Sequence, residues 1–264
     1  MAGGFSLRVL AEEPDREWVV MLPGAGATSA VWFLQVRRFR KQFNVALVDL
    51  PGHGGDMAAA QEPRPPYSFP ALADALGATV RAAGIRRCHV VALSLGTILA
   101  RHWASRDPGG IRSMVLAGTI ADLRPFARVL MRAGRMVRWA LPYMLLYRLY
   151  AWTIMPGAAH RVTRRLFYRD ARLLGRAEFD RWFALSRDVI PVLRALRAGP
   201  ALVPTLHVLG GGDYMFRGAA ERLASAQRSE IAVIPSSGHA CPVEAAEAFN
   251  QVSLEFLERL RDPA

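Results

Sequence analysis

Short apolar runs separated by helical patterns constrain the fold of this chain more than any other feature of its sequence. Runs such as 18–22, 45–50 and 112–117 are apolar over most of their length, which is typical of strands buried on both faces of a sheet. Similar runs lead into Ser94 and occupy 205–210 and 230–234, and residues 5–10 suit a short edge strand. Helical spacing recurs between these strand-like runs, for example over 68–83. This alternation predicts an α/β fold with a mostly parallel sheet and helices on both faces.

The alternation stops after Thr119. Residues 121–198 show helical periodicity alone, with expected breaks at Pro142, at Pro156-Gly157 and at Pro191. A chain of 264 residues is long enough for one large α/β core with an insertion. We therefore predict a core domain formed by 1–118 and 200–264 and an inserted helical cap formed by 119–199.

The positive charge of the chain belongs to the predicted cap. The formal net charge is +12, and residues 121–198 contribute +11 of it, from sixteen Arg and five acidic residues. The rest is nearly neutral and carries no recognised nucleic-acid-binding motif, so we expect no nucleic-acid partner. The Arg-rich cap suits peripheral contact with anionic substrates, acidic carrier proteins or a lipid surface, or it forms an ordinary solvated face.

Residues 128–141 of the cap predict an amphipathic helix. Arginines fall within one arc of the helix and apolar side chains lie opposite. The arginines are Arg128, Arg132, Arg135 and Arg138, and the apolar residues are Val129, Leu130, Ala133, Val137 and Leu141. The apolar stretch 139–155 is too short to span a bilayer, so no integral membrane segment is expected. The start of the chain shows no export signal, which favours a cytoplasmic location.

A serine within the turn after the third buried run suggests chemistry. Ser94 lies between a strand-like run and a helical pattern, with the small residues Ala92 and Gly96 two positions to either side. This is the local pattern of a nucleophile elbow, in which a sharp strand-to-helix turn exposes the serine hydroxyl. A serine hydroxyl attacks a carbonyl poorly at neutral pH, so Ser94 needs a histidine base, and the base needs a carboxylate that orients it.

Loop positions at strand ends select the candidate partners. His239 follows the run 230–234 in a glycine-flanked loop and is the favoured base, with His53 as the less favoured alternative. Asp213 follows the run 205–210 and is the favoured acid, with Asp122 after the run 112–117 as its rival.

Four segments in order resemble those of the α/β-hydrolase fold superfamily, in particular its Ser-Asp-His carboxylesterase and MenH-like group. They are Leu22–Gly26, Asp49–Gly54, Ala92–Gly96 and Gly238-His239, and the resemblance covers 18–118 and 200–260. It implies that the backbone amides of Ala25 and Leu95 form an oxyanion hole, and it places Gly24 against the substrate. Two positions depart from the common pattern, because Ala92 replaces a frequent glycine and Pro23 a frequent histidine.

These residues predict a serine hydrolase, an α/β-fold carboxylesterase that cleaves esters of a small-molecule acyl substrate through an acyl-serine intermediate. A thioesterase, a C–C bond hydrolase or a MenH-like lyase would use the same three residues, and a non-catalytic relative that binds a small ligand is a further alternative. Trp139, Tyr143 and Tyr147 of the cap would line an acyl pocket or form the core of the cap itself. Neither cofactor nor metal is expected, since the two cysteines, Cys88 and Cys241, lack metal-ligand spacing. The oligomeric state stays open.

Overall fold

A computed structural model describes residues 4–53, 66–157 and 160–261 of the chain. A seven-stranded sheet runs through its centre with the strand order β1-β3-β2-β4-β5-β6-β7. The strands are β1 (Ser6–Leu10), β2 (Trp18–Leu22), β3 (Asn44–Asp49), β4 (Cys88–Leu93), β5 (Ile111–Ala117), β6 (Thr205–Gly210) and β7 (Glu230–Ile234). β1 pairs antiparallel with β3 at one edge, and the other neighbouring strands pair in parallel.

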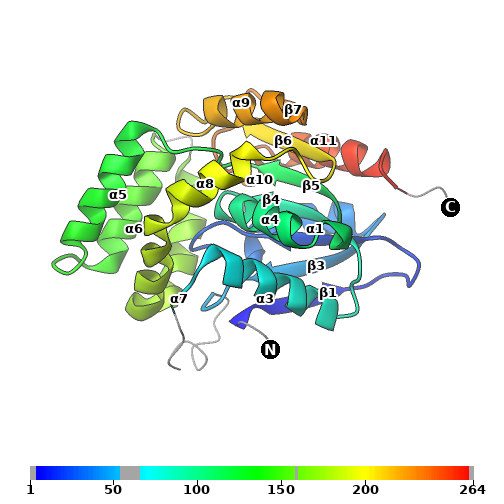
Figure 1. Ribbon diagram of the computed structural model, residues 1–264, viewed down its shortest axis with the longest axis horizontal. Coiled ribbons are helices and arrows are strands. Elements are labelled where there is room, and N and C mark those ends of the chain that lie inside the picture. The colour runs from blue at the N-terminus through cyan, green and yellow to red at the C-terminus, as the bar shows by residue number, and fades with distance from the viewer. Residues whose placement is uncertain (1–3, 54–65, 158–159, 262–264) are drawn as a thin grey trace.

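Helices cover both faces of the sheet (Figure 1). On one face α1 (Phe33–Phe39), preceded by the short helix η2 (Ser29–Trp32), packs against α11 (Ala246–Glu258), and on the other α3 (Phe69–Ala82) packs against α4 (Leu95–Arg106). The remaining core elements are η3 (Pro108–Gly110), α9 (Arg217–Gln227) and α10 (Cys241–Glu244). The predicted α/β fold is confirmed, and α3 begins after Ser68, whose hydroxyl accepts the Ala71 N–H as an N-cap.

The strand order brings several loops to one edge of the sheet. β2 is followed by β3 on one side, and β4, which pairs with β2 on the other side, is followed by β5, so the connections after β2 and β4 leave in opposite directions. Such a switch point opens a crevice beyond the carboxyl ends of the strands. The loops that follow β2, β4, β6 and β7 leave the sheet at this edge, because these strands are parallel.

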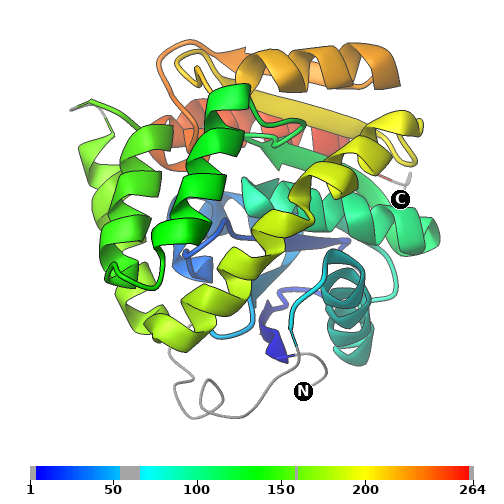
Figure 2. The ribbon, with the colours of Figure 1, turned by 60° about the vertical axis from the view of Figure 1, so that its left-hand side comes forward.

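Between β5 and β6 the described residues form helices alone. They are α5 (Pro125–Val137), α6 (Tyr143–Ile154), α7 (Arg161–Ala184), η4 (Leu185–Arg187) and α8 (Val189–Ala198). We call residues 119–199 the cap segment. Figure 2 shows α5, α6 and most of α7 gathered beyond one edge of the sheet, whereas α8 runs back across the core and contacts α4. Pro142 separates α5 from α6 as expected. The break expected at Pro191 lies a few residues earlier, between α7 and α8, and Pro191 itself lies in the first turn of α8, where a backbone N–H has no partner inside the helix.

Helix α5 is amphipathic, but its orientation differs from the usual one. Val129 and Met136 are 62% and 80% exposed, whereas Arg128 and Arg135 are half-buried. Arg128 bonds Asp122 and the Leu123 carbonyl, and Arg135 reaches the hydroxyl of Ser186. The expectation of a simple solvated arginine face is therefore wrong for α5. Some arginines of α5 make contacts within the chain, and much of the apolar side of the helix faces water.

Within the described part of the chain, no helix combines the length and the hydropathy that a membrane crossing requires. The cytoplasmic location stays a prediction.

Acid is expected to destabilise the protein through His207, a fully buried residue of β6. The Thr119 hydroxyl donates to the Leu116 carbonyl and therefore accepts Nδ1–H from a neutral His207. Burial, and then the charge of Arg101, lower the pKa of His207 to about 3. In the unfolded chain the pKa of His207 is about 6.5, so below that pH the unfolded chain binds a proton that the folded chain excludes. The free energy of unfolding therefore falls as the pH drops.

The His207 contribution to the free energy of unfolding should fall by about 2 kcal/mol between pH 7.5 and pH 5. Urea unfolding at several pH values measures it, and His207→Asn, which retains an N–H donor toward Thr119, should have a correspondingly flatter profile. Equal pH profiles for the two proteins would contradict this assignment.

Candidate active site

Ser94 occupies the sharp turn between β4 and α4. Its backbone has φ 54° and ψ −117°, a conformation that is unfavourable for residues other than glycine. The Ser94 N–H donates to the Ala117 carbonyl at 3.0 Å, and Thr97 donates to the Ser94 carbonyl through its N–H and hydroxyl. A side-chain carbon at Gly96 would lie 2.7 Å from the Pro23 carbonyl oxygen, which explains the small residue predicted there. The local geometry is that of a nucleophile elbow.

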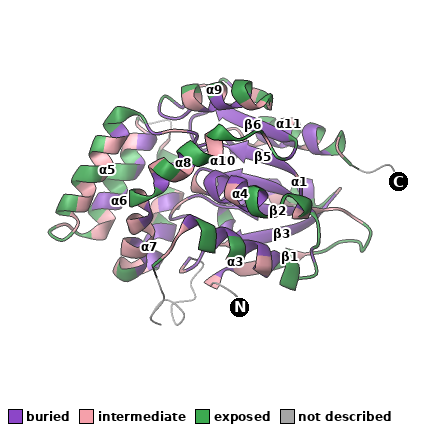
Figure 3. Ribbon diagram, in the orientation of Figure 1, coloured by how far each residue is buried: buried purple, intermediate pink, exposed green. Residues whose placement is uncertain are grey.

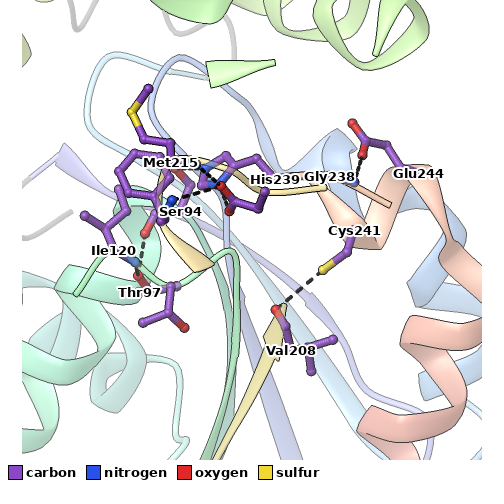
Figure 4. A network of polar contacts seen from close by, with 12 residues as sticks. Ser94, Thr97, Ile120, Val208, Met215, Gly238, His239, Cys241 and Glu244 are labelled. Carbon is purple, nitrogen blue, oxygen red and sulfur yellow. Dashed lines mark hydrogen bonds and ion pairs between the residues drawn. The ribbon is translucent and has the colours of Figure 1, made fainter. Parts of the chain in front are cut away.

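His239 joins Ser94 to a buried carboxylate. Its Nε2 lies 2.9 Å from the Ser94 Oγ (Figure 4), and its Nδ1 lies 2.8 Å from the Asp213 Oδ2. The three side chains come from the loops after β4, β6 and β7, and all three residues are buried. The ring of Phe216 lies against the imidazole with centroids 4.8 Å apart. The sequence-predicted nucleophile, base and acid are therefore hydrogen-bonded in one chain.

Asp213 is held as a charged carboxylate by its surroundings. Burial alone would raise the pKa of Asp213, but the attraction and hydrogen bond of His239, with two backbone amides, lower it below its ordinary value. The amides are those of Met215 and Phe216, which donate to Oδ1 at 3.2 and 3.0 Å. Since Oδ1 is occupied by these amides, Oδ2 faces the imidazole. This arrangement fixes the proton of a neutral His239 on Nδ1 and leaves Nε2 free to accept from Ser94.

The rival acid has other partners. One oxygen of Asp122 accepts the Leu123 N–H and a bond from Arg128, and the other pairs with Arg197. Asp122 thus ties the start of the cap segment to α8, and it is Asp213 that contacts His239.

The rival base stabilises the loop after β2. The Gly26 N–H donates to Nε2 of His53 at 3.1 Å, so Nε2 is an acceptor and Nδ1 carries the proton toward the Pro51 carbonyl at 3.0 Å. Burial lowers the pKa of His53, in agreement with this neutral form. His53 therefore orients backbone, while His239 contacts Ser94.

The loop after β2 approaches Ser94 closely. A side-chain carbon at Gly24 would lie 3.2 Å from the Ser94 Cβ, so glycine lets this backbone lie beside the serine. The Ala25–Gly26 peptide is held at both ends, because its N–H bonds His53 and its carbonyl accepts the hydroxyl of Tyr147 at 3.1 Å. Leu95 is the first residue of α4, so its N–H lacks a partner within the helix. The backbone predicted to form the oxyanion hole thus borders Ser94 on two sides.

The cap residues predicted to bind substrate differ in position. Tyr147 is buried over Gly26 and contacts the loop beside Ser94. Tyr143 donates to the Arg172 carbonyl at 3.2 Å and packs on Phe179, within the cap segment. Trp139 follows the end of α5, is 75% exposed, and lies under the Arg138 guanidinium. The structure does not bring Tyr143 or Trp139 to Ser94, because Tyr143 packs within the cap segment and Trp139 faces solvent.

Several contacts between cap and core escaped sequence reasoning. Asp170 of α7 accepts the N–H and hydroxyl of Thr28 at 3.0 and 2.7 Å, and the carboxylate of Glu244 in α10 accepts the Gly238 N–H and bonds His160. These partners are far apart in sequence, and no local motif predicts their contact. Gly118 was also missed, although a glycine directly after a buried strand was a usable signal. Its φ is +54°, and a side-chain carbon there would lie 2.5 Å from the His239 carbonyl oxygen.

A cavity lies beside the Asp213 loop. It has a volume of about 420 Å³ and is lined by Arg124, Pro125, Phe126, Tyr214 and Met215. Elsewhere both cysteines are buried, which raises the pKa of each thiol, and Cys241 Sγ donates to the Val208 carbonyl at 3.6 Å. In the described residues no three His, Cys, Asp or Glu side chains come together so as to hold a metal ion.

Two features together define a class of enzyme-like folds. One is a parallel sheet with a switch point, and the other is a serine, a histidine and an aspartate joined by hydrogen bonds at the carboxyl edge of that sheet. The model of the alpha/beta hydrolase family matches residues 19–252 of this chain. The chain belongs to the alpha/beta hydrolase family, and the resemblance seen in the sequence is confirmed.

Individual relatives carry different activities in their names. A pimeloyl-(acyl-carrier protein) methyl ester esterase of Chromobacterium violaceum is 36% identical over 113 residues, which are 43% of this chain and 40% of that esterase. A 2-succinyl-6-hydroxy-2,4-cyclohexadiene-1-carboxylate synthase of Serratia proteamaculans is 27% identical over 93% of this chain and 94% of its own. A solved hydrolase from Pseudomonas aeruginosa is 25% identical, with a TM-score of 0.82 and coverage of 96% of this chain and 94% of that one. The relatives support a hydrolase-type enzyme without selecting its substrate.

Proposed function

We propose that this protein hydrolyses carboxylic esters through an acyl intermediate on Ser94. The observation that carries the proposal is the hydrogen-bonded chain from the Ser94 Oγ through His239 to Asp213. The partial match to a methyl ester esterase supports an ester as substrate.

The geometry suits two-step acyl transfer. As the Ser94 Oγ attacks the ester carbonyl carbon, His239 Nε2 takes the hydroxyl proton, and Asp213 stabilises the imidazolium that forms. The backbone N–H groups of Ala25 and Leu95 would donate to the oxyanion. Collapse of the tetrahedral intermediate breaks the ester C–O bond, and His239 returns the proton to the leaving alcohol. Water then attacks the acyl-serine with His239 again acting as base, which releases the acid and restores Ser94.

A second candidate is the chemistry of the synthase that matches over nearly the whole chain. A lyase or C–C bond hydrolase would use the same serine and histidine. Acyl-CoA thioesters and vinylogous diketones, assayed beside simple esters, distinguish the candidates by their kcat/KM.

Labelling with a fluorophosphonate probe tests the proposal directly. Intact-mass measurement should show one adduct per chain, which peptide mapping places on Ser94, and p-nitrophenyl esters of short acyl chains should be hydrolysed. Absence of both labelling and ester hydrolysis would overturn the proposed function.

Tyr147→Phe is expected to lower kcat for ester hydrolysis about 3- to 10-fold with little change in KM. The variant loses the hydrogen bond that holds the Ala25 carbonyl, worth about 1 kcal/mol, and so loosens the peptide next to the proposed oxyanion donor. Steady-state kinetics on one ester measure the effect.

Tyr143→Phe is the matched control for this positioning role, because it removes a tyrosine hydroxyl from the same helix whose partner is the Arg172 carbonyl. An equal fall of kcat in the two variants would show a general effect of the cap and contradict a specific role of Tyr147.

A further inference from the structure

The outer surface of α5 and α6 exposes an unusual amount of apolar side chain. Of the eighteen large apolar residues exposed in the described part of the chain, ten lie between residues 123 and 169. The two helices form the end of the molecule remote from the C-terminus (Figures 1 and 2), and exposed positions recur along both (Figure 3). We call this surface the cap face and define it by Phe126, Val129, Met136, Trp139, Leu149 and Trp152.

The cap face lacks a partner within the described chain. In α5 only Ala127 is fully buried, although the helix is strongly amphipathic. The apolar side of a surface helix normally packs on the core, and large exposed apolar patches mark sites that contact another body. Met136 and Trp139, at 80% and 75% exposure, project into solvent near the end of α5.

Charge restricts what that other body is. Residues 123–169 contain ten Arg and neither Asp nor Glu. Some of these arginines pair within the chain, as Arg169 does with Asp170, but Arg132 and Arg148 are exposed beside the apolar residues. A second copy docking through the same face would oppose two acid-free arginine surfaces, which disfavours a symmetric dimer. The complementary partner is therefore anionic and accepts apolar side chains.

We propose that the cap face docks this protein on an anionic lipid surface. Tryptophan and phenylalanine rings favour the boundary between headgroups and acyl chains, and arginine bonds lipid phosphates while its stem stays apolar. The apolar side chains come from two helices and the turn that follows α5. A fluid bilayer accommodates such projections without a matching groove, whereas a folded protein partner would need one. Phe126 belongs both to the cap face and to the cavity beside the Asp213 loop.

Cosedimentation with vesicles tests the proposal independently of catalysis. The full chain should pellet with vesicles of phosphatidylcholine mixed with phosphatidylglycerol, should bind pure phosphatidylcholine much more weakly, and should be released by high salt. Met136→Ser combined with Trp139→Ser should weaken binding about tenfold or more, because two exposed apolar side chains no longer leave water. The matched control is Phe33→Ser on α1, which removes a ring that is 57% exposed on another part of the molecule.

Ser94→Ala should bind the vesicles as the unchanged protein does, so failure of the proposed hydrolysis and failure of membrane docking are separate results. The docking proposal is overturned if anionic vesicles do not pellet the protein, or if Phe33→Ser reduces binding as much as the double variant. Two further results would also overturn it. In the first, the unchanged protein is a dimer in sedimentation velocity and the double variant is a monomer. In the second, the unchanged protein binds an acidic carrier protein, the double variant does not, and neither protein binds vesicles.

Discussion

Ser94→Ala is expected to lower kcat/KM for ester hydrolysis by about 10⁴-fold or more, because the attacking oxygen is removed and direct attack by water replaces acyl transfer. The loss comes from the hydroxyl alone, since the backbone bonds that form the elbow, such as that from the Ser94 N–H to the Ala117 carbonyl, do not use the side chain. Steady-state kinetics with the best ester of the panel measure the change. Ser105→Ala, a hydroxyl removal near the other end of α4, is the matched control and should retain activity.

The backbone of Ser94 adds a stability readout to the same experiment. Its φ of 54° with ψ of −117° suits glycine, so Ser94→Gly should be inactive but more stable than the unchanged protein by about 1 kcal/mol. Urea unfolding measures the difference. A Ser94→Ala variant that keeps ester activity within tenfold would show that another residue supplies the nucleophile.

The sequence predicted most of the core because strand burial and glycine placement are local signals. The apolar runs agree with the observed bounds of β2 to β6 within one or two residues, and the position of Ser94 between Ala92 and Gly96 predicted its turn. Chain order then placed Asp213 and His239 at the same edge of the sheet, since consecutive loops of a parallel sheet share an edge.

The cap segment was harder to predict because its contacts are not local. Helical spacing located the helices but did not show which side of α5 would meet the core, so Trp139 was expected to line a pocket or to lie in the core of the cap, and it is exposed instead. The hydrogen bonds from Thr28 to Asp170 and from Tyr147 to Ala25 join residues more than a hundred positions apart. Such pairs follow from tertiary packing, which periodicity within one helix does not encode.

Asp213→Asn is expected to lower kcat/KM by about 10³- to 10⁴-fold, whereas Asp122→Asn should retain activity within a few-fold. An asparagine turns an N–H toward Nδ1 of His239, which favours the tautomer with its proton on Nε2, and that nitrogen no longer accepts from Ser94. Asp122→Asn weakens the ion pairs with Arg128 and Arg197 and leaves the imidazole untouched.

The pH dependence of the unchanged enzyme provides the second half of this test. Because His239 and two backbone amides keep the pKa of Asp213 below its ordinary value, this carboxylate stays charged to a lower pH than an ordinary aspartate does. A loss of activity at a mildly acidic pH, where even an ordinary aspartate is still charged, therefore reports a group other than Asp213. If Asp122→Asn abolished activity and Asp213→Asn preserved it, the acid of the site would have been assigned to the wrong loop, even though the hydrogen-bonded chain to Ser94 is formed by Asp213.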